Sequence, residues 1–219
     1  MINPDDYVIS RRRKLYKFAR FANNPLCYEF NEWQELFKAP TLQKVSVVEV
    51  GAGTGLFSVE LATRHPEQSY VAVDVKADRL QTGANEAVSR KLTNIRFVRM
   101  RADQLEQLAR PGSVEQLWLT FPDPFPRAGS AGRRLTHKTF LSTYTNMLSA
   151  DGSLYLKHDD PVFFTWSIEQ LVACGWSIDE LSFDLHDSDL ADDYMIKTTY
   201  EDRWLGEGRI TQFVRASPR

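Results

Sequence analysis

The sequence VVEVGAGTG at residues 47–55 is a run of β-branched residues that leads directly into three glycines. β-branched residues favour an extended strand. Gly51, Gly53 and Gly55 allow the tight turn and close backbone approach that a bound ligand needs. A helix-like segment follows from Leu56. The stretch therefore predicts a strand, a ligand-binding turn and a helix, which is the unit from which α/β folds are built.

Strand-like and helix-like segments alternate along the rest of the chain. We expect strands at 45–50, 69–74, 95–100, 116–121, 153–157, 176–183 and 208–214. We expect helices at 28–38, 56–65, 78–91, 103–109, 136–150 and 161–174. This order predicts a doubly wound, mostly parallel sheet with right-handed crossovers. Because no linker or repeat interrupts it, we expect one domain at 41–219, preceded by a basic arm and helix at 1–40.

Two acids flank the glycine turn and indicate its ligand. The spacing G-x-G-x-G differs from the dinucleotide fingerprint G-x-G-x-x-G. Glu49 would repel a pyrophosphate but suits a cationic amino-acid group. Asp74 ends the second strand, where a carboxylate can accept hydrogen bonds from both ribose hydroxyls. Together these residues predict a site for S-adenosylmethionine (SAM), with a tight turn beside a solvated acid as the alternative and NAD as the third choice.

A second motif, FPDPFPR, occupies residues 121–127, directly after an apolar strand-like run. Pro122 cannot donate to a sheet ladder and therefore ends the strand. Pro124 and Pro126 keep the backbone extended and fix the direction of Asp123. A stiff loop that presents one acid at a strand end is typical of active sites in open α/β sheets. The alternative is a rigid surface turn with a solvated aspartate.

Composition is that of a globular protein. Of the 219 residues 42% are hydrophobic and 26% charged, and the formal net charge is −2. No apolar run approaches the roughly 20 residues of a membrane span, and the amino terminus lacks a signal-peptide pattern. The 2 cysteines and 4 histidines do not have the spacing of a disulfide framework or metal site. We therefore expect a cytoplasmic protein without a metal or a membrane partner.

Positive charge is concentrated in two stretches. Residues 10–21 hold six cations and no acid, interleaved with aromatic residues. The second stretch runs from Arg127 to Lys138. Cations can contact phosphates while aromatic rings stack on bases, which indicates a nucleic-acid partner. The alternative for the first stretch is a solvated helix whose aromatic residues pack on the core.

Taken together, these features make the chain resemble the bacterial tRNA (guanine-N7)-methyltransferases from about residue 9 to residue 214. The motifs that carry the resemblance are VEVGAGTG at 48–55, FPDPFPR at 121–127, KHD at 157–159 and TTYE at 198–201. The resemblance implies a Rossmann-like methyltransferase fold with a seven-stranded sheet, its last strand antiparallel, and helices on both faces. It also implies methyl transfer from SAM to N7 of a variable-loop guanine, position 46 in tRNA numbering.

The resemblance implies a set of site residues. Asp123 is the candidate catalytic residue, at the junction of cofactor and guanine. The implied cofactor-binding residues are Glu49, Gly51, Gly53, Gly55, Asp74, Ala102, Asp103 and Asp123. The implied guanine-binding residues are Arg127, Asp159, Thr198, Thr199, Tyr200 and Glu201. The residues expected to contact tRNA phosphates are Arg11, Arg12, Arg13, Arg133 and Arg134.

Two departures from the family pattern keep other functions open. Arg101 stands where the family has an acid that binds the adenine amino group, and Asp103 is the nearest substitute. Residues 128–132 lack the family's usual basic side chains. One alternative is therefore a tRNA-binding protein with this fold and little or no turnover. The other is a SAM-dependent enzyme with a different acceptor, and the sequence is compatible with a monomer or a homodimer.

Overall fold

The computed structural model describes residues 12–38 and 45–219. Its contacts divide the chain into two compact units, Met1–Leu108 and Ala109–Arg219. The division predicted between residues 40 and 41 lies outside the described residues. No helix in the described ranges is long and apolar enough to cross a membrane.

The first unit contains four parallel strands in the order β1 (Cys27–Glu29), β4 (Ile95–Arg99), β3 (Tyr70–Asp74) and β2 (Val47–Val50). Every residue of β2 is buried, and β3 is buried up to its last residue, Asp74. Continuous apolar runs of this kind are typical of parallel strands covered on both faces. The three longest strands lie where the sequence predicts them.

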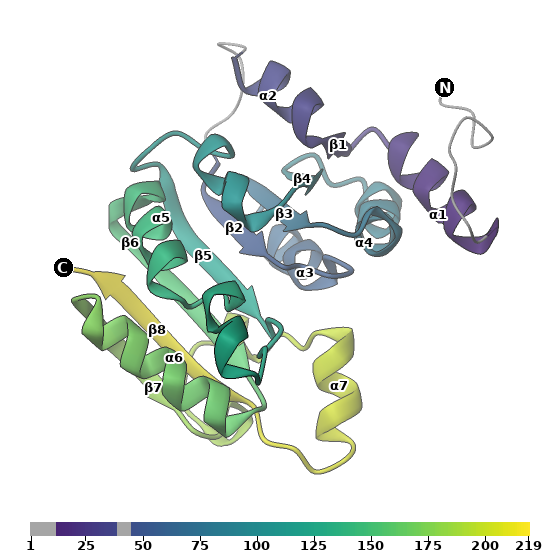
Figure 1. Cartoon of the computed structure of the whole chain (residues 1–219). Coiled ribbons are helices and arrows are strands. Elements are labelled where there is room, and N and C mark those ends of the chain that lie inside the picture. Colours follow the sequence, from purple (N-terminus) through teal and green to yellow (C-terminus); the bar gives the residue numbers. More distant parts are fainter. Residues whose placement is uncertain (1–11, 39–44) are drawn as a thin grey trace. The chain divides into compact units, whose positions relative to one another are not determined.

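The helices of the first unit are α1 (Arg12–Ala22), α2 (Phe30–Lys38), α3 (Leu56–Arg64), α4 (Ala77–Ser89) and the 3-10 helix η2 (Ala102–Gln107). Figure 1 shows α3 beside α4, and both pack on β3 and β4, while α1 packs on α4. The helix predicted from residue 28 begins at Phe30, because the residues before it pair with β4 as β1.

The second unit contains β5 (Val114–Thr120), β6 (Leu148–His158), β8 (Gln212–Pro218) and β7 (Trp176–Ser182), in that spatial order. β5 is parallel to β6, whereas β8 is antiparallel to both β6 and β7. The prediction of a mostly parallel α/β fold with an antiparallel last strand is therefore confirmed. The described residues contain eight strands, four in each unit, and the one beyond the implied seven is β1.

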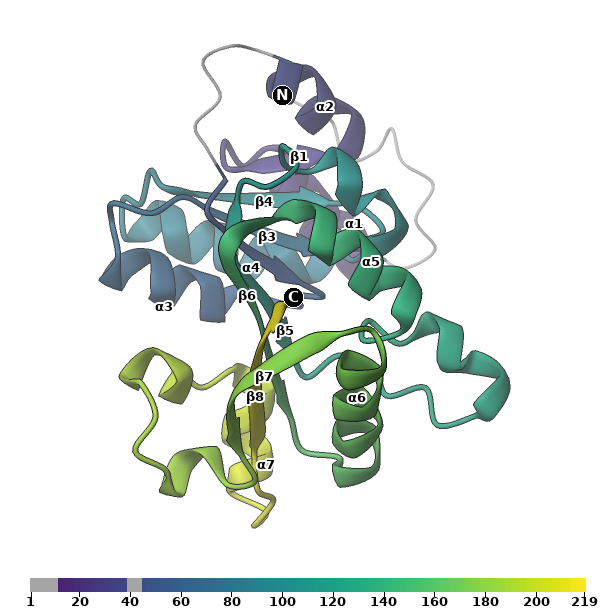
Figure 2. The same ribbon diagram turned by 90° about the vertical axis from the view of Figure 1, so that its left-hand side faces the viewer.

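The helices of the second unit are α5 (Lys138–Met147), α6 (Pro161–Ala173), α7 (Thr199–Leu205) and the 3-10 helices η3 (Ala128–Arg133), η4 (Leu185–Asp187) and η5 (Asp192–Met195). Figure 2 shows α5 and α6 on one side of the strands and the segment with η4 and η5 on the other. Asp160 caps α6 by accepting from the N–H groups of Val162 and Phe163, and Pro161 opens the helix as predicted.

One predicted turn is wrong. We expected Asp151 and Gly152 to separate a helix from a strand, but both lie inside β6. A Cβ on Gly152 would stand 2.7 Å from the Val114 carbonyl oxygen, so glycine allows β6 to approach β5 closely. The register between β5 and β6 shifts between Val114 and Gln116, next to the place where Gly152 contacts the Val114 carbonyl. The last strand also begins at Gln212 instead of residue 208, because the turn that follows α7 extends through Gly208.

Gly83 gives a stability test of how α4 packs on the glycine turn. Its N–H donates to the Thr54 carbonyl (2.8 Å), and a Cβ there would collide with that oxygen. Gly83→Ala should therefore destabilise the protein by about 1–3 kcal/mol through overpacking, although alanine gains up to about 1 kcal/mol in helix propensity. Urea unfolding measures the difference. Gly129→Ala, where a Cβ would meet no atom within 4 Å, is the control; a stabilised Gly83→Ala protein would contradict this packing.

Candidate active site

The three glycines after β2 are in the left-handed region, with φ of 75° at Gly51, 56° at Gly53 and 70° at Gly55. Side chains other than glycine are strained there. A Cβ on Gly55 would also lie 2.7 Å from a ring atom of Phe97, whereas one on Gly53 would meet nothing within 4 Å. Glycine at position 55 therefore permits close packing, and Gly53 leaves open space at the turn.

Two carboxylates border this turn. Asp74 accepts hydrogen bonds from the N–H groups of Gly53 (2.9 Å) and Lys76 (2.8 Å). A carboxylate has about four acceptor positions, so Asp74 can also accept from the hydroxyls of a ribose. Glu49 is 1% exposed and accepts a hydrogen bond from Ser58 Oγ of α3 (2.5 Å). The buried Glu49 fits the cationic amino-acid group of SAM. Asp74, which backbone N–H groups hold in place, fits the ribose, and Gly53 leaves open space beside it.

Arg101 and Asp103 form a bidentate ion pair at the start of η2. Arg101 Nε and Nη2 donate to the two Asp103 carboxylate oxygens at 2.9 and 2.8 Å. This guanidinium lowers the pKa of the Asp103 carboxyl. Both side chains are exposed, so the pair contributes little to stability. Adenine binding by Ala102 and Asp103 stays a prediction. In it the Asp103 carboxylate would accept hydrogen bonds from both Arg101 and the adenine amino group.

In the second unit, the loop at residues 121–127 contains two aromatic residues in the left-handed region. Phe121 has a φ of 51° and Phe125 a φ of 40°. Backbone strain of this kind costs about 1–3 kcal/mol per residue and persists only where surrounding contacts hold it. Asp123, between them, is exposed. The carbonyl groups of Pro122, Pro124 and Phe125 each accept a hydrogen bond from a side chain.

His158 holds the first of these carbonyls. The Asp160 N–H donates to its Nδ1 (2.8 Å), so Nε2 carries the proton and donates to the Pro122 carbonyl (2.9 Å). His158 is 3% exposed, and burial lowers the pKa of its imidazole, against an opposing contribution from the Pro122 carbonyl. The neutral imidazole is thus a fixed donor to the loop.

Arg134 holds the other two carbonyls. Its Nε donates to Pro124 (2.9 Å) and its Nη2 to Phe125 (3.1 Å), while its guanidinium stacks 4.3 Å from the Trp166 ring centre. Two of its nitrogen atoms therefore bond the loop, and the contact with RNA that the sequence predicts for Arg134 stays a prediction. Arg133 is exposed and stacks on Phe125 at 4.3 Å.

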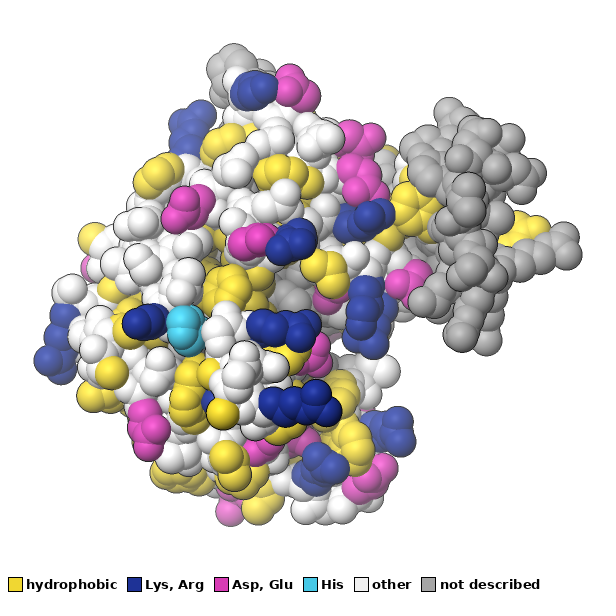
Figure 3. Space-filling model, viewed as in Figure 1, with side chains coloured by type: hydrophobic (Ala, Val, Ile, Leu, Met, Phe, Trp, Pro, Cys, Tyr) yellow, Lys and Arg dark blue, Asp and Glu magenta, His cyan; other side chains and the backbone are white. Residues whose placement is uncertain are grey.

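The remaining cations expected to contact RNA lie near the amino terminus. Arg12 and Arg13 open α1, and Arg11 lies outside the described residues. In the second unit, Figure 3 shows Lys and Arg side chains over the part that holds η3 and α7. Arg133 is the last residue of η3 and Arg203 lies in α7, and both are exposed.

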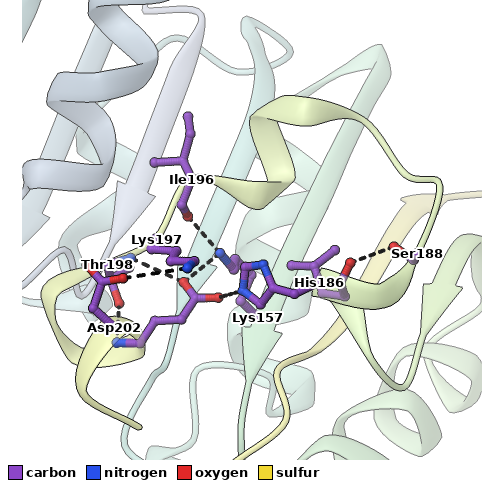
Figure 4. A network of polar contacts seen from close by, with 9 residues as sticks. Lys157, His186, Ser188, Ile196, Lys197, Thr198 and Asp202 are labelled. Atoms are coloured by element: carbon purple, nitrogen blue, oxygen red, sulfur yellow. Dashed lines mark hydrogen bonds and ion pairs between the residues drawn. The ribbon is translucent and has the colours of Figure 1, made fainter. Parts of the chain in front are cut away.

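A buried polar network fixes the start of α7. Lys157 Nζ donates to Glu201 Oε2 (2.7 Å) and to the Ile196 carbonyl (2.8 Å), and both charged side chains are fully buried. His186 Nε2 lies 2.7 Å from Glu201 Oε1. Thr198 and Glu201 cap the helix reciprocally, and Figure 4 shows Lys157, His186 and Thr198 converging on this network. The spacing T-x-x-E is a capping-box signal that could have revealed the helix in the sequence.

The six predicted guanine-binding residues divide into three pairs. Glu201 and Thr198 serve the network and the cap, and Arg127 and Thr199 are exposed on the surface. The other two belong to a set that we call the acceptor cluster, which consists of Phe121, Asp159, Tyr200, Trp204 and Arg209. Within the acceptor cluster, the centre of the Tyr200 ring lies 5.2 Å from the centre of the Phe121 ring and 5.5 Å from the centre of a Trp204 ring.

Asp159 and Arg209 form the polar part of the acceptor cluster. Arg209 Nη1 donates to Asp159 Oδ2 (2.8 Å), and its guanidinium carbon is 3.7 Å from the Trp204 ring centre. Burial raises the pKa of the Tyr200 hydroxyl, and the nearby Asp159 carboxylate acts in the same direction while Arg209 opposes it. Sequence reasoning missed Arg209 and Trp204, because neither lies in a recognised motif.

Comparisons with solved structures define the fold family. An antibiotic-related methyltransferase superposes with a TM-score of 0.61 at 15% identity, covering 85% of this chain and 92% of that one. The 16S rRNA methyltransferase KamB gives a TM-score of 0.60 at 16% identity, covering 86% of this chain and 94% of that one. At these identities the similarity concerns the fold alone. The chain therefore has the α/β fold of SAM-dependent methyltransferases, with that fold's glycine turn after β2.

Sequence comparisons define the family. A family model described as a putative methyltransferase matches residues 43–213. The tRNA (guanine-N(7)-)-methyltransferase of Brevibacillus brevis is 36% identical over 203 residues, 93% of this chain and 92% of that relative. The one from Cytophaga hutchinsonii is 36% identical over 180 residues, 81% of this chain and 80% of that relative. The chain belongs to the tRNA (guanine-N7)-methyltransferase family.

Lys157→Met should be strongly destabilising. It leaves the Glu201 carboxylate buried without its cation, and breaking a buried ion pair in this way costs about 3–5 kcal/mol. Adding Glu201→Gln should recover part of the loss, since the remaining side chain is neutral. The control is Lys197→Met, because the Lys197–Asp202 pair is half-exposed and 4.0 Å long. Urea unfolding gives all three values, and equal effects for Lys157→Met and Lys197→Met would contradict the role of the network.

His158 predicts a pH dependence of stability. Because its folded pKa is lowered, the unfolded chain binds more protons below the unfolded histidine pKa of about 6.5. The stability from neutral His158 is therefore complete above about pH 6.5 and is lost as the pH falls toward the lower folded pKa. Urea unfolding at several pH values should show a smaller loss on acidification for His158→Gln than for the parent. Parallel curves for the two proteins would refute this contribution.

Proposed function

We propose that this chain transfers the methyl group of SAM to N7 of a guanine in tRNA. The chain belongs to this family, and the observation that carries the proposal is its acceptor cluster. In this cluster the carboxylate of Asp159 lies near the half-exposed ring of Tyr200. Carboxylates accept from the N1–H and amino group of guanine, and aromatic rings stack on extruded bases. Adenine lacks that donor pair, so the cluster favours guanine.

The first unit supplies the residues that would hold the cofactor. Glu49 would bind the cationic amino group, Asp74 the ribose hydroxyls, and the turn at Gly51–Gly55 would allow close backbone approach. Bound SAM supplies an electrophilic methyl group on a positively charged sulfur. Adenine would contact η2 through the Ala102 N–H and Asp103.

The residues of the second unit would orient the acceptor. Guanine N7 has an in-plane lone pair and loses no proton on methylation, so the reaction needs no general base. Orientation of the reacting atoms can supply several kcal/mol of the barrier reduction. Asp123, presented by a loop with three bound carbonyl groups, would align the reacting groups through its charge. Phe121 and Tyr200 would bound the base.

Contacts to the tRNA backbone would come from exposed cations. Arg133 and the amino-terminal Arg11, Arg12 and Arg13 would contact phosphates, which makes binding dependent on salt. Arg134 would support the loop through Nε and Nη2, and its contact with a phosphate stays a prediction. We infer a cytoplasmic enzyme that acts as a monomer or a homodimer.

The test is methyl transfer from labelled SAM to an unmodified tRNA transcript. We expect label in the RNA and 7-methylguanosine among its nucleosides. A transcript made with 7-deazaguanosine retains the Watson–Crick edge of guanine but has no N7, so it should bind and accept no methyl group. Labelling of the 7-deaza transcript, or a different labelled nucleoside, would overturn the proposed acceptor atom.

Asp123→Asn should reduce kcat by roughly 10²-fold or more, because an amide cannot supply the charge that aligns the reacting groups. The fold and tRNA affinity should be retained, since the loop is held through its carbonyl groups and not through Asp123. Single-turnover methylation at saturating SAM, alongside a thermal melt, measures both properties. Asp151→Asn, an exposed acid of β6, is the control. A parent-like rate for Asp123→Asn would show that the loop is only a rigid turn.

A further inference from the structure

Arg209 covers the carboxylate that the proposed function assigns to guanine. Asp159 has 4% of its side chain exposed, whereas Arg209 has 46% exposed. The guanidinium bonds Asp159 Oδ2 through Nη1 and lies over the Trp204 ring at 3.7 Å. A base can reach Asp159 only if Arg209 moves or becomes part of the same contact.

The chemistry of guanine suits this pair of side chains. The Watson–Crick edge of guanine has two donors, N1–H and the amino group, and one acceptor, O6. A carboxylate complements the donors, and a guanidinium, which has five N–H donors and no acceptor, complements O6. Adenine has an amino group at the O6 position and an acceptor at N1, so both contacts would be mismatched.

We propose that Arg209 is a specificity-determining residue that donates a hydrogen bond to guanine O6 while Asp159 accepts from N1–H and the amino group. This inference rests on the proposed function and adds a residue to it. Only one donor atom of Arg209, Nη1, is bonded to Asp159. The attraction of a cation to an aromatic ring face does not fix one position, so the guanidinium can stay over Trp204 while it donates to O6.

The position of Arg209 also distinguishes it from an ordinary surface cation. Its neighbour Arg203 stacks on the same Trp204 ring at a longer distance, 5.2 Å, and pairs with the exposed Glu207. Arg209 instead contacts a buried acid next to Tyr200, the ring proposed to stack on the base. Of the two arginines that contact Trp204, Arg209 is the one bonded to Asp159, the carboxylate proposed to bind guanine.

A double-mutant cycle, in which one change is made in the enzyme and the other in the substrate base, tests this contact. Parent and Arg209→Met are assayed for kcat/KM on tRNA with guanine or 6-thioguanine at the methylated position. Sulfur at position 6 is a poor acceptor, whereas N1–H and the amino group are retained. On guanine, Arg209→Met should reduce kcat/KM by about 10- to 100-fold, the range for a hydrogen bond from a charged donor.

On 6-thioguanine the same substitution should reduce kcat/KM by less than about 3-fold, because the contact is already lost. Any effect of sulfur on N7 reactivity is common to both enzymes and cancels. Arg203→Met is the matched control and should have the same small effect on both bases. A thermal melt checks folding, and Arg209→Leu, which also lacks a hydrogen-bond donor, takes the place of Arg209→Met if that protein melts early.

Equal losses on guanine and 6-thioguanine would overturn the inference and leave Arg209 as a positioning residue for Asp159. In that case the parent would still form 7-methylguanosine, and the proposed function would stand. A parent that forms none from unmodified tRNA would overturn the proposed function and this inference with it.

Discussion

Three consecutive residues at the end of β6 hold together the segments that carry the proposed acceptor-binding residues of the second unit, and the position of those segments depends on them. Lys157 bonds Glu201 and fixes the start of α7. His158 bonds the Pro122 carbonyl and fixes the loop that carries Asp123. Asp159 bonds Arg209, in the segment between α7 and β8. One strand end therefore connects three segments that are far apart in sequence.

This arrangement is stable only because the buried groups are paired. Removing charges from water costs several kcal/mol per ion, and attraction repays the cost only with good geometry and further hydrogen bonds. Lys157 has both the Glu201 carboxylate and the Ile196 carbonyl as acceptors, and Glu201 also bonds His186 and the Thr198 N–H. The same bonds that satisfy these groups place Tyr200 beside Phe121, so the stability of the second unit and the position of the acceptor cluster have one origin.

The first unit was the more predictable from sequence, because its proposed site residues belong to, or directly follow, strands that lie where the sequence predicts them. Glu49 and the glycines follow from one strand and turn, and Asp74 from the end of the next strand. In the second unit the decisive contacts join residues far apart, such as Lys157 and Glu201, which are 44 positions apart. A sequence motif shows that Glu201 matters but not that its carboxylate is turned toward a buried lysine. Likewise, the pattern of charges predicts a phosphate contact for Arg134 but does not show that two of its nitrogen atoms bond loop carbonyl groups.

The most direct measurement of the central claim is chemical mapping of the methylated position in tRNA. An unmodified transcript is incubated with the protein and SAM, reduced with borohydride and treated with aniline, which cleaves the chain at 7-methylguanosine. We predict a single SAM-dependent cut at the guanine of the variable loop, absent without the protein. Methyl incorporation without a cut, or cuts at guanines throughout the transcript, would contradict the account.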